Sequence, residues 1–187
     1  LRNSSKKLIS YISNEKINFS YFKKIYIELM KAKNANNFNF FSKKYFEKLF
    51  KLIETNGFLV LISDKKKNKV AAGVFLYFND KVHYHLSASD KKFNYSGTMN
   101  LLLYEAAWHA KNLNIKTMHL GGGNSLDEND SLFKFKLSMS TDINNFHFVG
   151  RVHKKNIFNM FKKEWSKKYS QTSNQYKNFF LNYHFVN

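Results

Sequence analysis

Residues 96–123 have the sequence SGTMNLLLYEAAWHAKNLNIKTMHLGGG, a long apolar helical pattern followed by a short strand pattern and three glycines. Apolar side chains three and four residues apart predict a helix over 99–113, and Ser96 or Thr98 can cap its N-terminus. Residues 116–120 then favour a strand. Because a helix, a short loop and a strand that returns to the sheet form half of a crossover connection, we expect this strand to be parallel to an earlier one.

The predicted helix is the clearest in the chain. We expect one of its faces to be buried, and that face consists of Met99, Leu102, Leu103, Ala106, Ala107, Ala110 and Leu113.

The sequence before this helix predicts three consecutive antiparallel strands. Three apolar runs separated by polar turns carry the pattern, over residues 58–63, 70–78 and 81–89. Two amphipathic helical patterns, over 22–30 and 41–53, precede the strands. The order of elements predicts an α+β fold with a mixed, mostly antiparallel sheet flanked by helices.

The sequence after the glycines predicts a short helix over 131–139, a strand over 146–152 and a terminal amphipathic helix from about Asn156. There is no internal repeat, no low-complexity tract and no linker rich in Gly, Ser or Pro. We therefore expect a single domain over 1–187.

Within this domain we expect N-terminal helices over 1–57, the sheet with the central helices over 58–154, and a C-terminal helix with a tail over 155–187.

Charge is the strongest compositional feature of the 187-residue chain. Lys and Arg number 31 against 13 Asp and Glu, a formal net charge of +18. This excess suits a nucleic-acid partner, but only Arg2 and Arg151 are arginines, the usual residues for bidentate contacts to bases and phosphates. Basic and acidic side chains number 12 and 4 over 1–57, 11 and 8 over 58–150, and 8 and 1 over 151–187. The function is therefore sought in the nearly neutral middle.

Other features of the composition exclude whole classes of protein. Hydrophobic residues make up 43% of the chain and aromatic residues 18%, which is enough for a packed core and argues against disorder. The absence of Cys excludes a disulfide scaffold, a thiolate zinc site and a Cys nucleophile. No apolar run approaches the roughly 20 residues of a membrane span. Because the first residue is Leu1 rather than Met, we expect a processed or truncated chain.

The triple glycine Gly121, Gly122 and Gly123 is the most informative local feature. Glycines at the carboxyl end of a strand allow positive φ angles and let a ligand approach the backbone, although a mobile turn would have the same composition. The predicted helix start at Ser96, Gly97 and Thr98 offers unpaired backbone N–H groups, as every helix start does.

The segment Ser131–Lys136, SLFKFK, alternates aromatic and lysine side chains. Such a pattern can stack a base and hold a phosphate or an oxyanion, and two core phenylalanines with two solvated lysines would give it equally well. His83 and His85 are two residues apart in a predicted strand, so both face one side. They can act as a metal pair or an acid/base pair, and two half-buried strand histidines would give the same pattern.

No third metal ligand is evident for the two histidines. The acidic cluster Asp127, Glu128 and Asp130 indicates a solvated loop or a weak cation site.

Three of these stretches together resemble a known family. HYHLSAS at 83–89, HLGGG at 119–123 and SLFKFK at 131–136 are similar to the FemAB-like branch of the GNAT superfamily. The pattern resembles both its BioF2-like acyltransferase domain and the peptidoglycan interpeptide-bridge aminoacyltransferases. The resemblance covers roughly Phe22 to Phe161. It implies the GNAT (acyl-CoA N-acyltransferase-like) fold and the transfer of an acyl or aminoacyl group to an amine.

The resemblance also implies roles for individual residues. Lys136 stabilises the tetrahedral intermediate and Phe135 contacts the donor; the other expected donor-binding residues are Lys134, Ser96, Gly97, Thr98, Gly121, Gly122 and Gly123. His85 is the acid/base candidate. No metal and no permanently bound cofactor are implied, and the co-substrate is an aminoacyl-tRNA or an acyl-CoA.

Two departures from the family pattern bear on the donor and the acceptor. The chain has half the length of a tandem Fem enzyme and corresponds to the second half, so it could be the C-terminal part of a larger tandem chain. It also lacks the Arg/Gln-rich Gly-x-Gly loop that acetyl-CoA users carry before the helix at Ser96.

The expected function is therefore acyl or aminoacyl transfer to an amine of a cell-envelope precursor, a peptidoglycan peptide or a surface glycan. The expected location is cytoplasmic, at the inner face of the membrane, with tRNA as a donor and an anionic membrane as a peripheral contact. One alternative is an acetyl-CoA-dependent N-acetyltransferase of a sugar or an amine. The other is a non-catalytic basic domain that binds RNA or a membrane surface.

Overall fold

The computed structural model describes residues 7–123, 125, 127, 129–140, 142–147, 149–177 and 179–185. The chain forms two compact units, residues 1–141 and residues 142–187. We describe each unit by itself, and a single domain over 1–187 stays a prediction.

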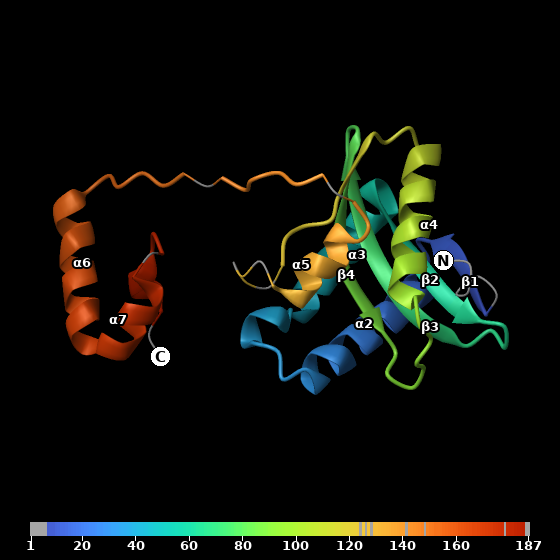
Figure 1. Ribbon diagram of the computed structural model, residues 1–187, viewed down its shortest axis with the longest axis horizontal. Helices are drawn as coiled ribbons and strands as arrows, with labels where there is room; N and C mark the ends of the chain where they lie inside the picture. The colour runs from blue at the N-terminus through green and yellow to red at the C-terminus, as the bar shows by residue number, and fades with distance from the viewer. Residues whose placement is uncertain are drawn as a thin grey trace. The chain divides into compact units, whose positions relative to one another are not determined.

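The first unit is built on a five-stranded sheet with the strand order β1-β2-β3-β4-β5 (Figure 1). Neighbouring strands are antiparallel except for β5, which is parallel to β4 as the crossover argument predicts. The sequence analysis missed β1, which pairs with β2 along its full length. The strands are β1 Leu8–Ser13, β2 Gly57–Asp64, β3 Lys69–Phe78, β4 Lys81–Ser89 and β5 Thr117–His119.

Helices cover both faces of this sheet. Helices α2 and α3 pack on one face, and α4 packs on the other (Figure 1). The short helix α5 lies on the side of α4, because its Phe135 packs against the core beneath that helix. The helical segments of this unit are α2 Lys16–Ala32, η1 Asn37–Asn39, α3 Lys43–Asn56, α4 Thr98–Asn112 and α5 Ser131–Leu137.

The sheet therefore separates two hydrophobic cores. Val60, Phe75 and Leu102 belong to the core on the α4 side, whereas Phe22 and Leu59 belong to the core on the side of α2 and α3. All five side chains are at least 99% buried. A strand buried on both faces has a nearly continuous apolar sequence, which explains the uninterrupted run in β2.

Strand β4 contains a β-bulge at His85. Val74 pairs with Leu86 and Phe75 pairs with Tyr84, so His85 is an extra residue in β4. The bulge changes the faces of the side chains that follow. Tyr84 packs against the core on the α4 side, whereas Leu86 packs against the core on the side of α2 and α3.

Two expectations about these elements are wrong. Residues 146–147 and 149–152 are not in a strand, and Phe146 and Val149 are 89% and 96% exposed. Alternating apolar residues form a strand only where a neighbouring strand pairs with them. Ala107 on α4 and Leu113 just after its end are exposed, whereas Leu101 is buried, because the core covers a different part of the helix surface.

The second unit is helical. Its described elements are α6 Lys155–Lys168, α7 Ser170–Tyr176 and η2 Asn182–His184. Trp165 is buried, and its indole N–H donates to the carbonyl of Phe185. The terminal amphipathic helix predicted from about Asn156 is thus confirmed as α6. Within the described part of the chain, every helix is too short or too polar to cross a bilayer.

Candidate functional site

The glycine segment and α5 meet at Lys136. The Lys136 ammonium donates to the carbonyl of Gly122 at 2.6 Å. Gly121 has a φ of +73°, a conformation that side chains with a Cβ rarely adopt. A Cβ on Gly121 would lie only 3.3 Å from the Lys136 Nζ. The two motifs that the sequence analysis joined, GGG and SLFKFK, are therefore in direct contact.

A second contact fixes the start of α5 against the same glycines. The Asp130 carboxylate accepts from the backbone N–H of Phe133 at 2.9 Å and so caps the helix. A Cβ on Gly123 would lie 2.5 Å from an oxygen of this carboxylate, so only a glycine permits the approach. The Asp130 cap therefore holds the start of α5 beside Gly123, and Lys136 holds its last turn beside Gly122.

Lys136 lies over an aromatic side chain of β4. Its Nζ is 5.8 Å from the centroid of the Tyr84 ring, a cation–π distance. Burial lowers the pKa of the Lys136 ammonium from its ordinary value, and the nearby Asp130 carboxylate acts in the opposite direction. The surroundings thus place a half-buried cation beside β4.

Strands β4 and β5 pair over only three residues. The pairing described between them ends at His83 and His119, whereas β4 continues to Ser89. Beyond His83, β4 therefore presents an edge that β5 does not cover. The unpaired backbone groups of such an edge can bind an extended chain as an added strand.

Histidine side chains gather where the two strands end their pairing. The Nδ1 atoms of His83 and His119 are 3.0 Å apart, so one nitrogen donates and the other accepts. The ring centroids of His83 and His85 are 5.9 Å apart, which confirms that the two rings lie together. Burial lowers the pKa of His83, and the charges of His119 and Lys136 lower it further.

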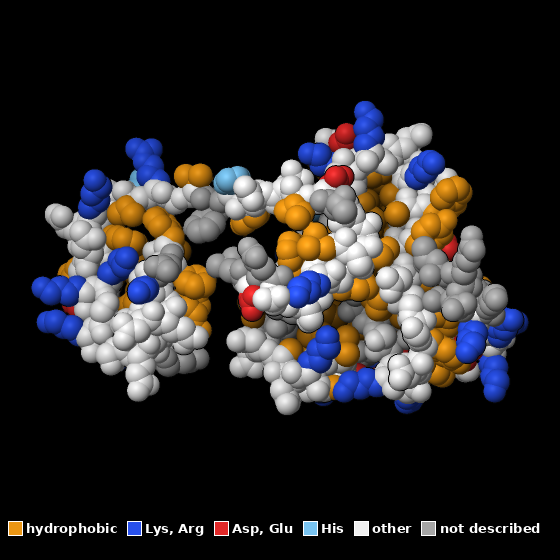
Figure 2. Space-filling model, viewed as in Figure 1, with side chains coloured by type: hydrophobic (Ala, Val, Ile, Leu, Met, Phe, Trp, Pro, Cys, Tyr) orange, Lys and Arg blue, Asp and Glu red, His pale blue; other side chains and the backbone are white. Residues whose placement is uncertain are grey.

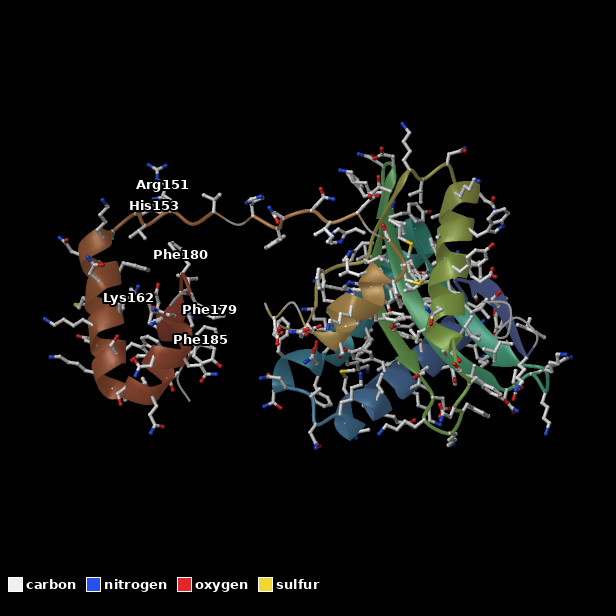
Figure 3. All side chains as sticks on the ribbon, in the orientation of Figure 1. Arg151, His153, Lys162, Phe179, Phe180 and Phe185 are labelled. Atoms are coloured by element: carbon white, nitrogen blue, oxygen red, sulfur yellow. The ribbon has the colours of Figure 1, made fainter. Side chains whose placement is uncertain are left out.

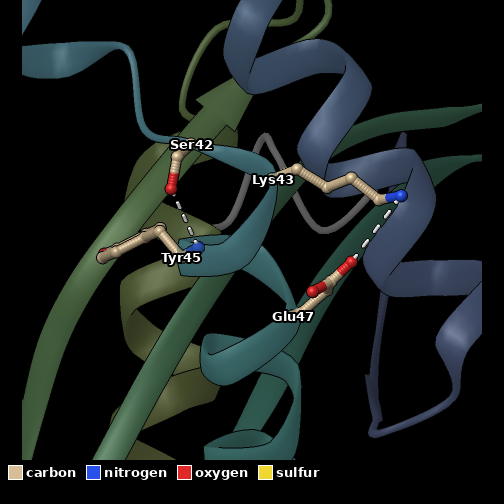
Figure 4. A network of polar contacts seen from close by, with 4 residues as sticks. All are labelled: Ser42, Lys43, Tyr45 and Glu47. Carbon is tan, nitrogen blue, oxygen red and sulfur yellow. Dashed lines mark hydrogen bonds and ion pairs between the residues drawn. The ribbon is translucent and has the colours of Figure 1, made fainter.

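His85 has a partner from the opposite helix layer. The Tyr45 hydroxyl, from the first turn of α3, lies 2.6 Å from the His85 Nε2. The side chain of Ser42 caps this turn by accepting from the backbone N–H of Tyr45 at 3.2 Å (Figure 4). The Lys43–Glu47 ion pair beside it spans 3.9 Å between exposed side chains and adds little.

The other predicted donor-binding residues have structural contacts. Phe135 packs against the core on the α4 side. The Lys134 ammonium donates to the side chain of Asn129 at 2.7 Å and is exposed, away from the Lys136 contact. The hydroxyl of Thr98 donates to the carbonyl of Tyr95 at 2.7 Å. Their contacts with a donor stay predictions.

The turn 96–98 lies at the start of α4. Gly97 precedes the helix with a φ of +77°. In the first turn of α4, the Asn100 amide is 3.6 Å from the sulfur of Met139, just after α5. This contact brings the start of α4 and the end of α5 together.

The two described members of the acidic cluster, Asp127 and Asp130, make contacts within the loop. Asp130 caps α5, and Asp127 accepts from the backbone N–H of Asn129 at 2.8 Å. Glu128 lies outside the described residues. Among the described side chains, no group of three carboxylates or imidazoles is placed to hold a metal ion.

Sequence reasoning gave no role to three residues of this site. Tyr45 lies in a predicted helix over 41–53, whereas Tyr84 and His119 stand within the HYHLSAS and HLGGG stretches. The HxH pattern at 83–85 drew attention to β4, but no local pattern connects it with Tyr45, which is 40 residues away. The parallel pairing of β4 with β5 brings His119 beside His83.

The second unit contains a groove made of its own residues. About 210 Å³ in volume, it is lined by cationic and aromatic side chains that include Arg151, Lys154, Phe158 and Phe180. Figure 3 shows Arg151 and Phe180 on neighbouring segments. On the face that Figure 2 shows, Lys and Arg are scattered over the surface of both units.

Comparison with known proteins agrees with this architecture. The model of the FemAB family matches residues 59–162, more than half of the chain. A possible acetyltransferase from Clostridium difficile 630 aligns with a TM-score of 0.57 at 17% identity, over 79% of this chain and 99% of that protein. No curated protein matches the sequence.

Two further structures show the same fold. An aminoglycoside acetyltransferase from an uncultured soil metagenomic sample has a TM-score of 0.55 and 12% identity, over 79% of this chain and 97% of that one. A GNAT family acetyltransferase from Staphylococcus aureus has a TM-score of 0.50 and 17% identity, over 78% and 99%. The GNAT fold expected from the sequence is thus confirmed, and the chain belongs to the FemAB family of acyltransferases.

Proposed function

We propose that the first unit transfers an acyl or aminoacyl group from an activated ester or thioester to an amine. The observation that carries this proposal is the position of Lys136, whose ammonium binds the carbonyl of Gly122 beside the uncovered edge of β4. An ammonium has three N–H donors, and Gly122 uses one of them. The others can stabilise the negative oxygen that forms when the amine attacks the acyl carbon.

The donor lies along β4 in this proposal. The edge of β4 beyond His83 offers backbone groups to an extended acyl-bearing chain. Gly121, Gly122 and Gly123 allow the donor to approach the backbone, and the turn 96–98 binds the donor's anionic part at the start of α4. Lys134 and Phe135 complete the proposed donor contacts.

The acceptor amine approaches from the side of α3. His85 lies on that side, where it contacts Tyr45, and we propose that it receives the proton that the amine must lose. We further propose that the amine belongs to a cell-envelope precursor, a peptidoglycan peptide or a surface glycan, by analogy with the FemAB family. Attack by a free amine on an activated carbonyl needs positioning and proton removal more than a protein nucleophile.

The expected effect of removing the Lys136 charge is a large loss of turnover. Lys136→Met keeps the length of the side chain but cannot stabilise an oxyanion, so kcat should fall by about 100-fold or more. The measurement is steady-state acyl transfer, with circular dichroism to verify folding.

The matched control is Lys111→Met, because Lys111 also lies over an aromatic ring, at 5.5 Å from the Trp108 centroid, but on the far part of α4. Its kcat should match the original chain. Equal activity of Lys136→Met and Lys111→Met would contradict the proposed role of Lys136.

The identity of the donor separates two forms of the proposal. An aminoacyl-tRNA fits the analogy with FemAB enzymes, whereas an acetyl-CoA-dependent sugar or amine N-acetyltransferase fits the likeness of the fold to acetyltransferases. Calorimetric titration with acetyl-CoA distinguishes them. Saturable binding of acetyl-CoA, unchanged in Lys136→Met, favours the thioester donor. Acyl transfer from a charged tRNA, without acetyl-CoA binding, favours the ester donor.

The C-terminal unit suggests how a polyanionic donor or surface could be held. Residues 142–187 contain eight Lys and Arg against two Asp and Glu. We propose that these side chains bind the phosphates of a tRNA donor, and that the chain works in the cytoplasm at the inner face of an anionic membrane. Binding to tRNA should weaken steeply with salt, whereas binding to anionic vesicles alone would favour the membrane contact.

A non-catalytic RNA-binding or membrane-binding domain is the outcome if tRNA binds tightly and no acyl transfer occurs with either donor.

A further inference from the structure

The contact between Tyr45 and His85 joins two elements that are distant in the sequence. The Tyr45 hydroxyl comes from α3 and lies 2.6 Å from the Nε2 of His85 in β4. Both side chains are half-buried. The acyl-transfer proposal above uses His85 and gives Tyr45 no role.

The surroundings hold the Tyr45 ring in one orientation. It stacks on Phe41 with centroids 4.1 Å apart and planes 16° apart, and it meets Phe46 edge-on at 5.6 Å. The Ser42 cap fixes the backbone of the same turn (Figure 4). A ring packed on two sides has little freedom, so its hydroxyl has a defined position before any substrate binds.

The β-bulge accounts for the position of His85. As the extra residue of β4, His85 lies between Tyr84, which packs toward α4, and Leu86, which packs toward α2 and α3. Bulges re-aim a side chain from a strand and are frequent beside active sites. The bulge thus brings the imidazole to the first turn of α3.

The protonation states give the hydrogen bond a direction. Burial raises the pKa of Tyr45, so the phenol keeps its proton. Burial lowers the pKa of His85, and the neighbouring His83 lowers it further, so the imidazole is neutral near pH 7. Tyr45 therefore donates to Nε2, and the neutral imidazole carries its own proton on Nδ1.

We propose that Tyr45 and His85 form a proton relay in which the Tyr45 hydroxyl, rather than the imidazole, meets the acceptor amine. The inference rests on the acyl transfer proposed above. As the amine nitrogen bonds to the acyl carbon, its proton passes to the Tyr45 oxygen, and the Tyr45 proton passes to the His85 Nε2. The bond from the acyl carbon to the donor oxygen or sulfur breaks, and that atom leaves with the bonding electrons.

Tyr45 and His85 return to their starting protonation states without any other reactant. After transfer, Tyr45 is neutral again and His85 is an imidazolium. The imidazolium returns its proton to the departing oxygen or sulfur, directly or through water, and the site is restored.

Other titratable groups near His85 favour this neutral starting state. His83 neighbours it on β4, His119 from β5 contacts His83, and the cationic Lys136 from α5 acts on His83. Each of these groups, when protonated, opposes a positive charge on the imidazole cluster. The His85 imidazole therefore starts neutral and can accept a proton.

Nitrogen-15 NMR of the full chain labelled in its histidine rings tests the hydrogen bond without any substrate. His85→Gln identifies the His85 signals by their loss. We expect the original chain to show an unprotonated Nε2 and a protonated Nδ1. In Tyr45→Phe the Nε2 signal should shift and the pKa of His85 should rise, because the hydroxyl that stabilises the neutral form is gone. A protonated Nε2 in the original chain would overturn the relay.

Kinetics test the transfer step. Tyr45→Phe keeps the stacked ring and should lower kcat by about 100-fold, within the usual range for acid–base catalysis. The limb of the kcat/KM profile that rises with pH should also move to higher pH, following the raised pKa of His85.

The matched control is Tyr26→Phe. Tyr26 belongs to the same aromatic cluster and stacks on Phe41 at 5.9 Å, but its hydroxyl donates to the carbonyl of Asn39 at 3.0 Å. It should leave kcat, the pH profile and the His85 signals unchanged. Equal loss of kcat in the two variants would overturn the relay while leaving acyl transfer established.

Failure of the proposed function gives a different result. If the original chain transfers no acyl group from acetyl-CoA or from a charged tRNA, the acyl-transfer proposal fails and the relay fails with it as a catalytic step. The NMR measurement still decides whether Tyr45 donates to His85. The two failures are therefore distinguishable.

Discussion

At the scale of single residues, Gly121 determines where the Lys136 ammonium can lie. Its φ of +73° turns the chain after β5, and this turn presents the carbonyl of Gly122 to the Lys136 Nζ. A Cβ on Gly121 would lie 3.3 Å from the Lys136 Nζ, so the ammonium would have to shift to admit it. The position of the Lys136 ammonium thus depends on the backbone conformation of Gly121, which has no side chain.

Replacing this glycine should affect both stability and activity. Gly121→Ala imposes a left-handed conformation on a residue with a Cβ, which costs about 1–2 kcal/mol of unfolding free energy, and it displaces Lys136. Gly122→Ala is the matched control for stability, because its Cβ would meet no atom within 4 Å. Urea denaturation of both variants measures the loss of stability, and acyl-transfer assays of Gly121→Ala measure the effect of displacing Lys136. Equal unfolding free energies of the two variants would show that position 121 tolerates a side chain.

At the scale of elements, the hairpin of β2 and β3 organises the sheet that supports the site. The Asp64 carboxylate at its turn accepts from the side chain of Asn68 and from the backbone N–H groups of Lys66 and Asn68, all at 2.9 Å. The Tyr95 hydroxyl, from the loop before α4, donates to it at 3.2 Å. One side chain therefore joins the hairpin to the loop that leads into α4.

The Asp64 contacts should make stability depend on pH. The hydrogen bond from the Asn68 side chain, with the other donors, holds the pKa of Asp64 below its ordinary value. A carboxylate with a lower pKa in the folded state stabilises the protein above its unfolded pKa of about 4, and this stability is lost as the pH falls through the folded pKa. Asp64→Asn should remove this part of the acid dependence in denaturation curves.

The control for Asp64 is Asp80→Asn in the β3–β4 turn. There the backbone carbonyl of Asp80 accepts from Lys116 and Thr117, and the substitution leaves that carbonyl in place. Asp80→Asn should retain the acid dependence of the original chain. An unchanged acid dependence in Asp64→Asn would mean that other carboxylates cause it.

At the scale of the whole molecule, the site belongs to the first of the two units. Both hydrophobic cores consist of residues from 1–141, as do the Lys136 and His85 contacts. The second unit has its own aromatic cluster, in which Tyr176 stacks on Phe185 at 4.0 Å. Each unit therefore contains packing that does not depend on the other.

The fragment 1–141 should fold by itself. Its cores are complete, so we expect a cooperative thermal transition. Trp108 and Trp165 are the two tryptophans of the chain, one in each unit, so the full chain with Trp165→Phe reports the first unit alone. The fragment and this variant should have the same fluorescence midpoint. An unfolded fragment would show that residues 142–187 contribute to the cores.

Local patterns predicted most of the elements because their causes are local. The apolar period of α4 and the apolar runs of β3 and β4 reflect how a short segment satisfies its own backbone and buries one face. The parallel placement of β5 also followed, since a short connection leaves few alternatives. The prediction of a strand over 146–152 was wrong, because an alternating apolar pattern does not indicate which neighbouring strand would pair with it.

The sequence by itself thus determined the fold class, the order of the central elements, the family motifs and the pairing of GGG with SLFKFK. Only the tertiary structure decided that Lys136 binds Gly122, that His85 occupies a bulge and that Tyr45 reaches it from α3. The physical reason is the distance along the chain over which each interaction acts. Periodicity and turn chemistry act over a few residues, whereas a site forms from side chains that meet only when distant segments pack on the same sheet.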